Sequence, residues 1–349
     1  MLLAAQLAAL AWPAYACGCG GMVTRDRSRI AVEHETSAVS WDGRTEQILM
    51  SLKVSGDAEE AAWIMPVPQR ATVRLGGPRL FTQLGRLTAP VHRDRHHFWP
   101  RSGDWPYDDE DGAAAPGGAV DVVGWKRLGP FDVATLTATD PDALEDWLDD
   151  NGFALPERLG RELKPYVERR WEYVAIRLAP GSNERGDVLG GTLEPLHLTF
   201  ESEQFVYPMR LSRAASKPQY LRLYVLAAHR MRPVSAIGGD EPRLRFAGRV
   251  DRPSDAVRRF AGGTGGGAAQ EDVFLTAYDQ YFPVPGRISG DHELRRARSD
   301  SAFRTVVYDD QLLTWGGVPA WLVTAGVVLF ALVWAVLRRA RARRPLPFS

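Results

Sequence analysis

The stretch Glu46–Pro68, EQILMSLKVSGDAEEAAWIMPVP, decides the fold class because apolar residues first recur in it at every second position. Four apolar side chains fall on one face of an extended chain: Ile48, Met50, Leu52 and Val54. The opposite face carries polar side chains, among them Gln47, Ser51 and Lys53. Alternation with a period of two is typical of a β-strand that buries one face. The stretch therefore predicts a sheet.

The same alternation predicts further strands along the chain. It recurs at residues 131–139, 171–178, 196–202, 204–211, 220–227 and 304–309. Pro208 lies inside one of these stretches and lacks the N–H that a central strand needs, so it predicts an edge strand or a bulge there. Strands thus make up most of the expected structure.

Three stretches show the helical spacing of apolar residues instead. They are residues 77–87, 140–152 and 155–170. Pro141 stands at the first helical position of the second stretch and Gly152 ends it. Because strands dominate and do not alternate regularly with helices, we expect an α+β domain of mostly antiparallel sheet with about three short helices.

The first 16 residues resemble a secretory signal. Residues 1–16, MLLAAQLAALAWPAYA, have an apolar core, and small residues at Ala14 and Ala16 form an A-x-A cleavage pattern. We expect residues 1–16 to be a signal peptide and the domain that follows to be exported.

The C-terminal region contains a long uncharged stretch at residues 318–337, VPAWLVTAGVVLFALVWAVL. At about 1.5 Å per residue it spans roughly 30 Å, the thickness of a bilayer's hydrocarbon core. Trp315 and Trp321 lie near its start, as interfacial aromatic residues do, and five arginines follow its end within residues 338–349. The pattern predicts a single-pass membrane protein with a transmembrane helix at 318–337 and a basic cytoplasmic tail at 338–349.

Residues 17–315 then form an extracytoplasmic domain, as one body or two sub-lobes, with an exposed loop at residues 91–118. Five of the 43 basic residues lie in the tail, which leaves 38 basic against 43 acidic residues in the exported part. A mildly acidic domain argues against nucleic acid as its partner. The expected partners are the lipid bilayer, through the one helix, and an envelope protein or glycan.

Both cysteines of the chain, Cys17 and Cys19, lie directly after the predicted cleavage point. Thiols outside the membrane tend to oxidise, and an i, i+2 pair can just reach the Cα separation of about 4.4 to 6.8 Å that a disulfide needs. Besides a free pair, four interpretations stay open: a disulfide between the two, bonds to another chain, lipidation of Cys17 as the mature N-terminus, and metal ligation.

A second candidate for metal binding is the histidine-rich stretch that begins at His92. His92 and His96 would share one face of a helix, with His97 close by, and imidazole suits zinc, copper or nickel. Arg93 occupies the position at which the H-E-x-x-H motif of a zinc hydrolase has its glutamate. The candidate metal ligands are therefore Cys17, Cys19, His92, His96 and His97, against the alternative of a solvated loop.

The sequence shows no recognisable catalytic motif. The chain has no G-x-S-x-G elbow and no S-x-x-K motif, and GGTGGG at 262–267 lacks the Gly-Lys-Ser/Thr ending of a phosphate-binding loop. Glu201 and Glu203 share a strand face and are a pair of the kind that flanks a sugar, although paired surface carboxylates are common. No catalytic residue and no cofactor-binding residue is predicted, and the question of a cofactor stays open.

Several segments together resemble a known family. Residues 56–90 carry W-hydrophobic-hydrophobic-P-V-P followed by F-x-x-L and T-x-P, and similar segments lie at 144–178, 195–212 and 274–282. With the cysteine/glycine motif and the single C-terminal span, the chain resembles the uncharacterised bacterial family catalogued as domain of unknown function number 2330. The resemblance implies an envelope protein that is exported and held by one span, and it implies no activity.

Three functions remain open. The favoured one is a non-enzymatic, membrane-anchored module that binds or scaffolds a partner in the cell envelope. The others are an envelope hydrolase or carbohydrate-active enzyme, and a metal or redox protein that uses Cys17 and Cys19. A shallow apolar groove would favour the first and a deep polar cleft with clustered carboxylates the second.

Overall fold

The computed structural model describes residues 20–25, 28–101, 104, 132–136, 143–180, 188–262 and 273–342, with the backbone alone at 132–136. The predicted signal peptide, Cys17 and Cys19 lie outside the described residues. The chain divides into two compact units, residues 1–89 with 120–304 and residues 90–119 with 305–349.

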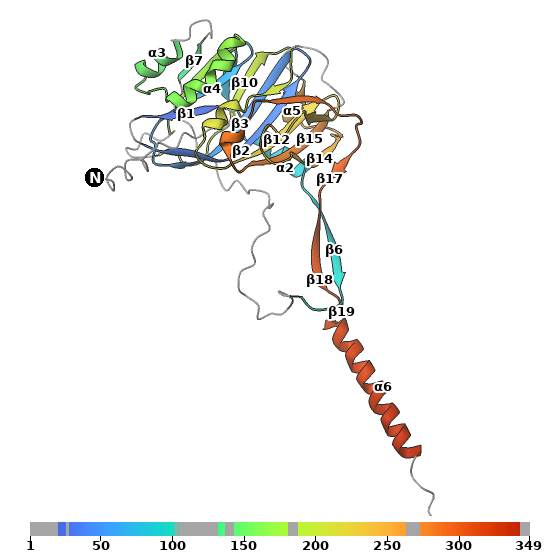
Figure 1. Cartoon of the computed structure of the whole chain (residues 1–349). Helices are drawn as coiled ribbons and strands as arrows, with labels where there is room; N and C mark the ends of the chain where they lie inside the picture. The colour runs from blue at the N-terminus through green and yellow to red at the C-terminus, as the bar shows by residue number, and fades with distance from the viewer. Residues whose placement is uncertain are drawn as a thin grey trace, which may run out of the picture. The chain divides into compact units, whose positions relative to one another are not determined.

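A nine-stranded sheet forms the largest part of the first unit (Figure 1). Its order is β17-β14-β15-β12-β2-β3-β10-β5, and β9 pairs with β3. The strands are β2 (Ile30–Trp41), β3 (Thr45–Gly56), β5 (Thr72–Leu75), β9 (Gly191–Thr192), β10 (Leu196–Glu201), β12 (Gln219–Ala227), β14 (Arg243–Arg249), β15 (Phe274–Phe282) and β17 (Phe303–Arg304). Neighbours are antiparallel except β2 and β12, which are parallel. The sheet is therefore mixed, because a long crossover connects those two strands in the same direction.

A four-stranded antiparallel sheet packs face to face against the large one. Its order is β1 (Gly21–Thr24), β4 (Ala61–Val67), β8 (Glu172–Leu178) and β7 (Asp132–Leu136). The largest core lies between the sheets and contains the whole apolar face predicted for β3, together with Trp63, Met65 and Ile176. All seven residues of β4 are buried because both faces of its sheet are covered. The alternation in β3 is thus confirmed as a core face.

Helices cover the outer faces of both sheets. On the smaller sheet, α3 (Ala143–Asp150) and α4 (Glu157–Glu168) bury Leu144, Leu148, Leu159 and Leu163 against Ile64 and Ala175. On the larger sheet, α2 (Arg79–Leu87) and α5 (Asp255–Ala261) bury Leu84 and Phe260 against Leu226 and Leu275. The three predicted helices are confirmed as α2, α3 and α4. The expected number of about three short helices is too low, since α5 is a fourth; with the separately expected C-terminal helix the described total is five. At seven residues, α5 is too short to show a periodic stripe.

A three-stranded antiparallel sheet completes the first unit, in the order β11 (Val206–Tyr207), β16 (His292–Arg296) and β13 (Met231–Pro233). As Pro208 predicts, β11 lies at the sheet edge and ends at the residue before the proline. Two short 3-10 turns flank this region, η1 (Arg210–Ala214) and η2 (Pro285–Arg287).

The second unit contains a two-stranded ribbon, a short hairpin and a long helix. Strand β6 (Val91–His97) pairs in parallel with β18 (Val306–Leu312), and β19 (Thr314–Trp315) pairs with β20 (Val318–Pro319). The first seven residues of the expected loop 91–118 are therefore a strand. Its partner is distant in the sequence, and cross-strand ion pairs such as Arg95 with Asp310 accompany the pairing.

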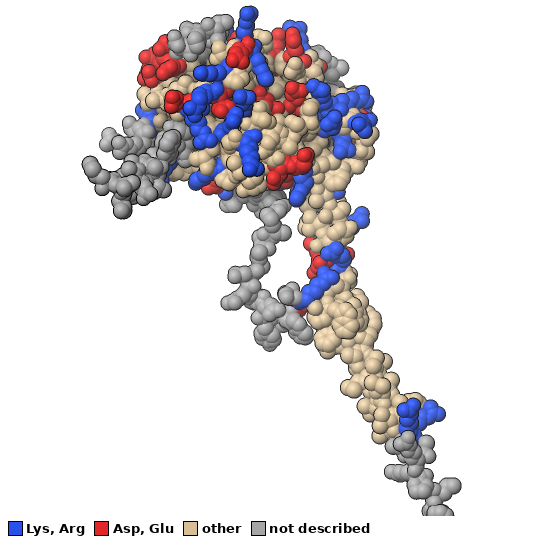
Figure 2. All heavy atoms as spheres, viewed as in Figure 1, with Lys and Arg blue, Asp and Glu red and all other residues tan. Residues whose placement is uncertain are grey.

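The last helix, α6 (Ala320–Ala342), can cross a membrane by length and composition. Residues 320–339 have a mean hydropathy of 2.4, and almost none of this segment is buried. Figure 2 shows no charged side chain along the helix until the arginines at its end. Val318 and Pro319 belong to β20, so the helix begins two residues later than the predicted span.

Candidate binding groove

The histidines predicted as metal ligands lie on β6, where they do not converge. His96 lies four positions after His92 on the strand, which is roughly 13 Å and too far for one ion. His92 Nδ1 lies 3.0 Å from Asp309 Oδ2, and His97 Nε2 lies 2.8 Å from Asp104 Oδ2. Within the described residues no group of three potential ligands is placed to hold a metal. Metal binding by Cys17 and Cys19 stays a prediction.

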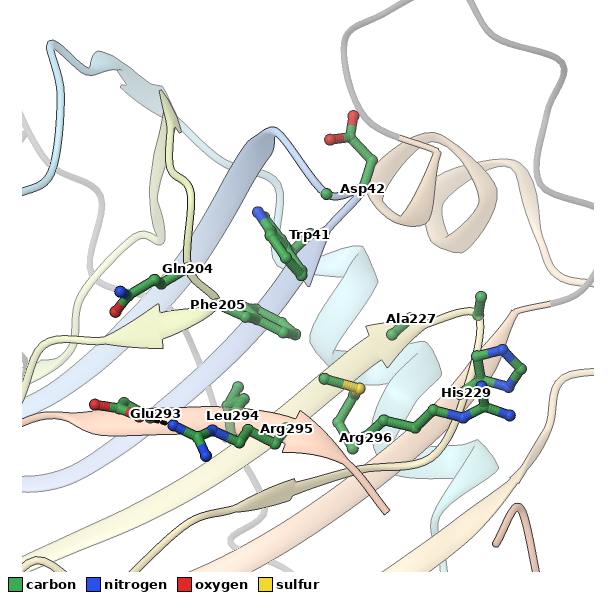
Figure 3. Close-up of a pocket in the computed structure, with 13 residues that line it drawn as sticks. Trp41, Asp42, Gln204, Phe205, Ala227, His229, Glu293, Leu294, Arg295 and Arg296 are labelled. Atoms are coloured by element: carbon green, nitrogen blue, oxygen red, sulfur yellow. Dashed lines mark hydrogen bonds and ion pairs between the residues drawn. The ribbon is translucent and has the colours of Figure 1, made fainter. Parts of the chain in front are cut away.

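A groove on the first unit is the strongest candidate site. Its floor consists of Trp41, Phe205, Met231 and Leu294, and its volume is about 610 Å³. Phe205, Met231 and Leu294 are buried core residues, while Trp41 is half-buried. The rings of Trp41 and Phe205 stack with their centroids 5.8 Å apart (Figure 3). We call this site the Trp41 groove.

A tight turn between β2 and β3 fixes the position of Trp41. The carboxylate of Asp42 accepts hydrogen bonds from the backbone N–H groups of Arg44 at 3.0 Å and Thr45 at 2.7 Å. Gly43 takes a φ of +98°, which a residue without Cβ adopts readily. The indole Nε1 of Trp41 donates to the carbonyl of Ser202 at 3.0 Å. The ring is therefore held in place before any ligand arrives.

Charges of both signs line the rim of the Trp41 groove. Glu293 and Arg295 form an exposed ion pair at 3.0 Å, and Arg296 follows on the same strand. His229 also lines the groove (Figure 3), and its Nδ1 lies 2.8 Å from Asp300 Oδ2. An apolar floor with a mixed-charge rim suits a ligand that is apolar in its centre and polar at its edges.

A second, polar hollow of about 890 Å³ adjoins the groove and shares Gly43, Gln204 and Glu293 with it. Glu201 and Glu203, the acidic pair noted in the sequence, both line this hollow. Glu201 is already paired with Arg44 at 3.0 Å, so only Glu203 of the two lacks a charged partner that the structure describes. We call this site the Glu203 hollow.

The backbone at one edge of the Glu203 hollow is strained. Arg170 there has a φ of +56°, a left-handed conformation that is unusual for a residue with Cβ. Trp171 follows it, and the guanidinium of Arg169 lies 6.0 Å from the indole. Arg169 and Arg170 thus line the same hollow as the carboxylates of Glu201 and Glu203.

A buried acidic residue lies next to the Trp41 groove and the Glu203 hollow. Glu46 is directly opposite Trp41 in the β2–β3 register and is fully buried. Its Oε2 accepts a hydrogen bond from the backbone N–H of Val206 at 3.3 Å, whereas Oε1 has no partner among the described residues. Burial raises the pKa of Glu46 well above its ordinary value, and the bond from Val206 offsets this only in part. The site therefore favours the neutral acid.

Only part of the groove has a signal in the sequence. Asp42–Gly43 after a strand is typical of a tight turn, which indicates that Trp41 lies at a strand end. Phe205, Met231 and Leu294 come from three later segments that reach the groove through β11, β13 and β16. No local pattern marks these three as its floor.

Comparison with known proteins identifies a family model and a distantly similar solved structure. The family model described as "Uncharacterized protein conserved in bacteria (DUF2330)" matches residues 13–295. No match to the chain was found among the curated proteins. A solved structure, described as the crystal structure of baculovirus P35, is 8% identical, with 77% of this chain and 98% of that chain covered and a TM-score of 0.36. A likeness at that score carries no argument about fold or function.

Proposed function

The chain belongs to the bacterial family of uncharacterised proteins DUF2330, and from this premise we propose that it is a membrane-anchored module that binds a polypeptide segment in the Trp41 groove. The observation that carries the proposal is the groove's composition. The floor is aromatic and aliphatic and is already ordered. Its rim carries two acidic residues, Asp42 and Glu293, and two basic ones, Arg295 and Arg296.

A polypeptide fits this composition better than a sugar does. One face of the Trp41 ring is covered by Phe205, and its Nε1 is already bound to Ser202. The thioether of Met231 and the side chain of Leu294 offer apolar contact but no hydrogen bonds to hydroxyl groups. An apolar anchor side chain would occupy the floor, while backbone and charged groups of the segment meet the rim.

Membrane attachment is the second part of the proposal. The apolar length of α6 supports a span, and the arginines of 338–349 support a cytoplasmic tail. In this arrangement residues 1–16 are removed as a signal peptide and residues 17–315 lie outside the cytoplasm, in the cell envelope. The state of Cys17 and Cys19, including a disulfide between them, belongs to the same proposal.

A carbohydrate-active protein is the second candidate, and the Glu203 hollow is the observation that favours it. The hollow is more polar than the groove and gathers three carboxylates, Glu201, Glu203 and Glu293. Its arginines weaken the case, because Arg44 already neutralises Glu201 and leaves fewer carboxylates for acid–base chemistry.

The binding experiment uses the full chain in phosphatidylcholine nanodiscs, screened against a random peptide library and a glycan array. We expect selected peptides with an apolar anchor, and we expect Trp41→Ala to weaken their binding at least about tenfold, as loss of a central aromatic anchor does. Arg295→Glu should weaken the binding of acidic peptides and leave the binding of basic peptides unchanged. Arg243→Glu, an exposed charge reversal on β14, is the matched control.

Three results would contradict the peptide proposal. They are binding that Trp41→Ala leaves unchanged in a folded protein, equal effects of Arg295→Glu and Arg243→Glu, and glycans as the only ligands. The last result, with loss on Glu203→Gln, would establish the carbohydrate candidate instead.

A further inference from the structure

Two distant segments of the second unit meet where the ribbon ends and α6 begins. The carbonyl of His97, the last residue of β6, accepts a hydrogen bond from the N–H of Leu313 at 2.9 Å. The carbonyl of Leu313 in turn accepts from the N–H of Ala320, the first residue of α6, at 2.8 Å. The end of β6 is therefore tied to the start of the helix.

After β6 the chain turns back along the ribbon. Arg101 Nη1 lies 3.2 Å from Asp310 Oδ2, and the N–H of Arg101 donates to Asp104 Oδ2. The same carboxylate of Asp104 lies 2.8 Å from His97 Nε2. These contacts hold residues on both sides of Phe98–Pro100, so Phe98, Trp99 and Pro100 form a tip at the end of the ribbon.

This tip and the hairpin beside it expose large apolar side chains. The exposed fraction is 69% for Trp99, 52% for Trp315 and 46% for Val318. Phe98 packs edge-on against Trp99, with ring centroids 5.1 Å apart. Neither Phe98–Pro100 nor Leu312–Trp321 contains a charged residue. Apolar groups gathered at this density on a soluble surface normally contact another phase or molecule.

Charged groups lie on the other side of the tip, along the ribbon. Arg95 and Arg101 both pair with Asp310, and His92 pairs with Asp309. Polarity therefore decreases along this unit from an ion-paired ribbon, through an uncharged aromatic layer, to the apolar helix α6 (Figure 2). Trp side chains are enriched at the layer between water and hydrocarbon because the ring is apolar and the N–H is polar.

We infer that Phe98, Trp99, Trp315 and Val318 form a collar that lies in the headgroup layer of the bilayer that α6 enters. The inference rests on the proposed membrane span and adds a second chain segment to it. Continuity with α6 selects a lipid surface as the partner, because Ala320 follows the hairpin directly. Trp99 is separated from α6 by most of the chain and joins the collar only through the β6–β18 pairing, across which Arg95 and Asp310 are 215 residues apart.

The test measures depth at three positions of the full chain, in a Cys17→Ser, Cys19→Ser background. Trp99→Cys carries a nitroxide label at the collar, Val284→Cys an aqueous control on the first unit, and Phe330→Cys a control in the middle of α6. The protein is reconstituted in phosphatidylcholine bilayers, and each label is exposed to oxygen, which partitions into lipid, or to a water-soluble nickel chelate.

For the collar we expect position 99 to fall between the controls, with a nickel-chelate accessibility severalfold below that of position 284 and an oxygen accessibility severalfold above it. If the label at position 99 is in water while the label at position 330 is in lipid, the collar is overturned but the membrane span of α6 is not. Position 330 in water would overturn both. If the label at position 99 is accessible neither to oxygen nor to the nickel chelate, protein covers this position, which also overturns the inference.

A second measurement keeps the aromatic ring at the position tested. Wild type and Trp99→Phe are compared in bilayers whose lipids carry bromine near the headgroups. The collar requires that bromine quench wild-type fluorescence by a larger fraction than it quenches Trp99→Phe. Equal fractional quenching of the two proteins would contradict it.

Discussion

At the scale of single residues, burial on both faces of the sheets controls the titratable groups. Burial lowers the pKa of His34, His197 and His292 to about 4, and it raises the pKa of Glu46. In each case the low-dielectric surroundings penalise the charged form. All four groups lie on strands of the first unit, so the folded state there favours neutral side chains.

His292 gives the clearest pH dependence, because burial is the single cause of its shift. Between its ordinary pKa of 6.5 and the folded pKa of about 4, the unfolded chain binds more protons than the folded one. The stability that His292 contributes is therefore fully present above pH 6.5 and falls as the pH drops toward 4. We expect His292→Gln to reduce the loss of unfolding free energy between pH 7 and pH 4.5 by about 2 to 3 kcal/mol.

The measurement is denaturant unfolding of both proteins at the two pH values. His96→Gln, which removes an exposed imidazole from β6, is the matched control for the loss of a histidine. If His292→Gln lost as much stability on acidification as wild type does, the buried neutral imidazole would be refuted.

At the scale of elements, short pieces depend on contacts that their own sequence does not supply. Helix α5 begins after Ser254, whose Oγ accepts from the N–H of Val257 at 3.4 Å and also bonds to Gln83 of α2. The two helices share one apolar cluster on the large sheet. The cap therefore both starts α5 and joins it to α2.

Removing that cap tests this double role. We expect Ser254→Ala to lower the free energy of unfolding by about 1 kcal/mol, as loss of an N-cap hydroxyl typically does. The check is thermal unfolding beside Ser216→Ala, which removes a hydroxyl from an exposed loop position. A Gln83→Ala, Ser254→Ala double variant should lose less than the sum of the singles, because the two side chains interact. Strict additivity would show that the link between the helices contributes nothing.

At the scale of the whole molecule, the chain combines a layered first unit with a second unit that contains the apolar helix. The helices and sheets of the first unit bury three apolar clusters, whereas α6 leaves its apolar side chains uncovered by protein. An uncovered helix of this length is stable in lipid, where its backbone bonds are all internal. The composition and exposure of α6 thus support the proposed membrane span.

The proposed orientation of the chain rests on its basic tail. In spheroplasts, with the native cysteines replaced by serine, we expect a membrane-impermeant maleimide to label Val284→Cys before lysis and Ser349→Cys only after it. The reason is that arginines near the end of a span stay on the cytoplasmic side. Labelling of Ser349→Cys in intact spheroplasts would contradict the proposed cytoplasmic location of the tail.

The sequence by itself determined the features that depend on neighbouring residues. The alternation at Ile48, Met50, Leu52 and Val54 identified a core face, and helical spacing located α2, α3 and α4. Uninterrupted apolar composition identified α6, and the family motifs identified DUF2330. Each of these signals lies within a short window, where backbone geometry alone places side chains on one face.

Only the tertiary structure decided which distant segments meet. The parallel pairs β2–β12 and β6–β18, the floor of the Trp41 groove and the position of Trp99 beside α6 all join residues far apart in the chain. Such pairs form because the layered cores and cross-strand hydrogen bonds offset the entropy of closing long loops. No local periodicity in the sequence indicates whether these contacts outweigh the loop entropy. For this reason the candidate site can be recognised only in the folded protein.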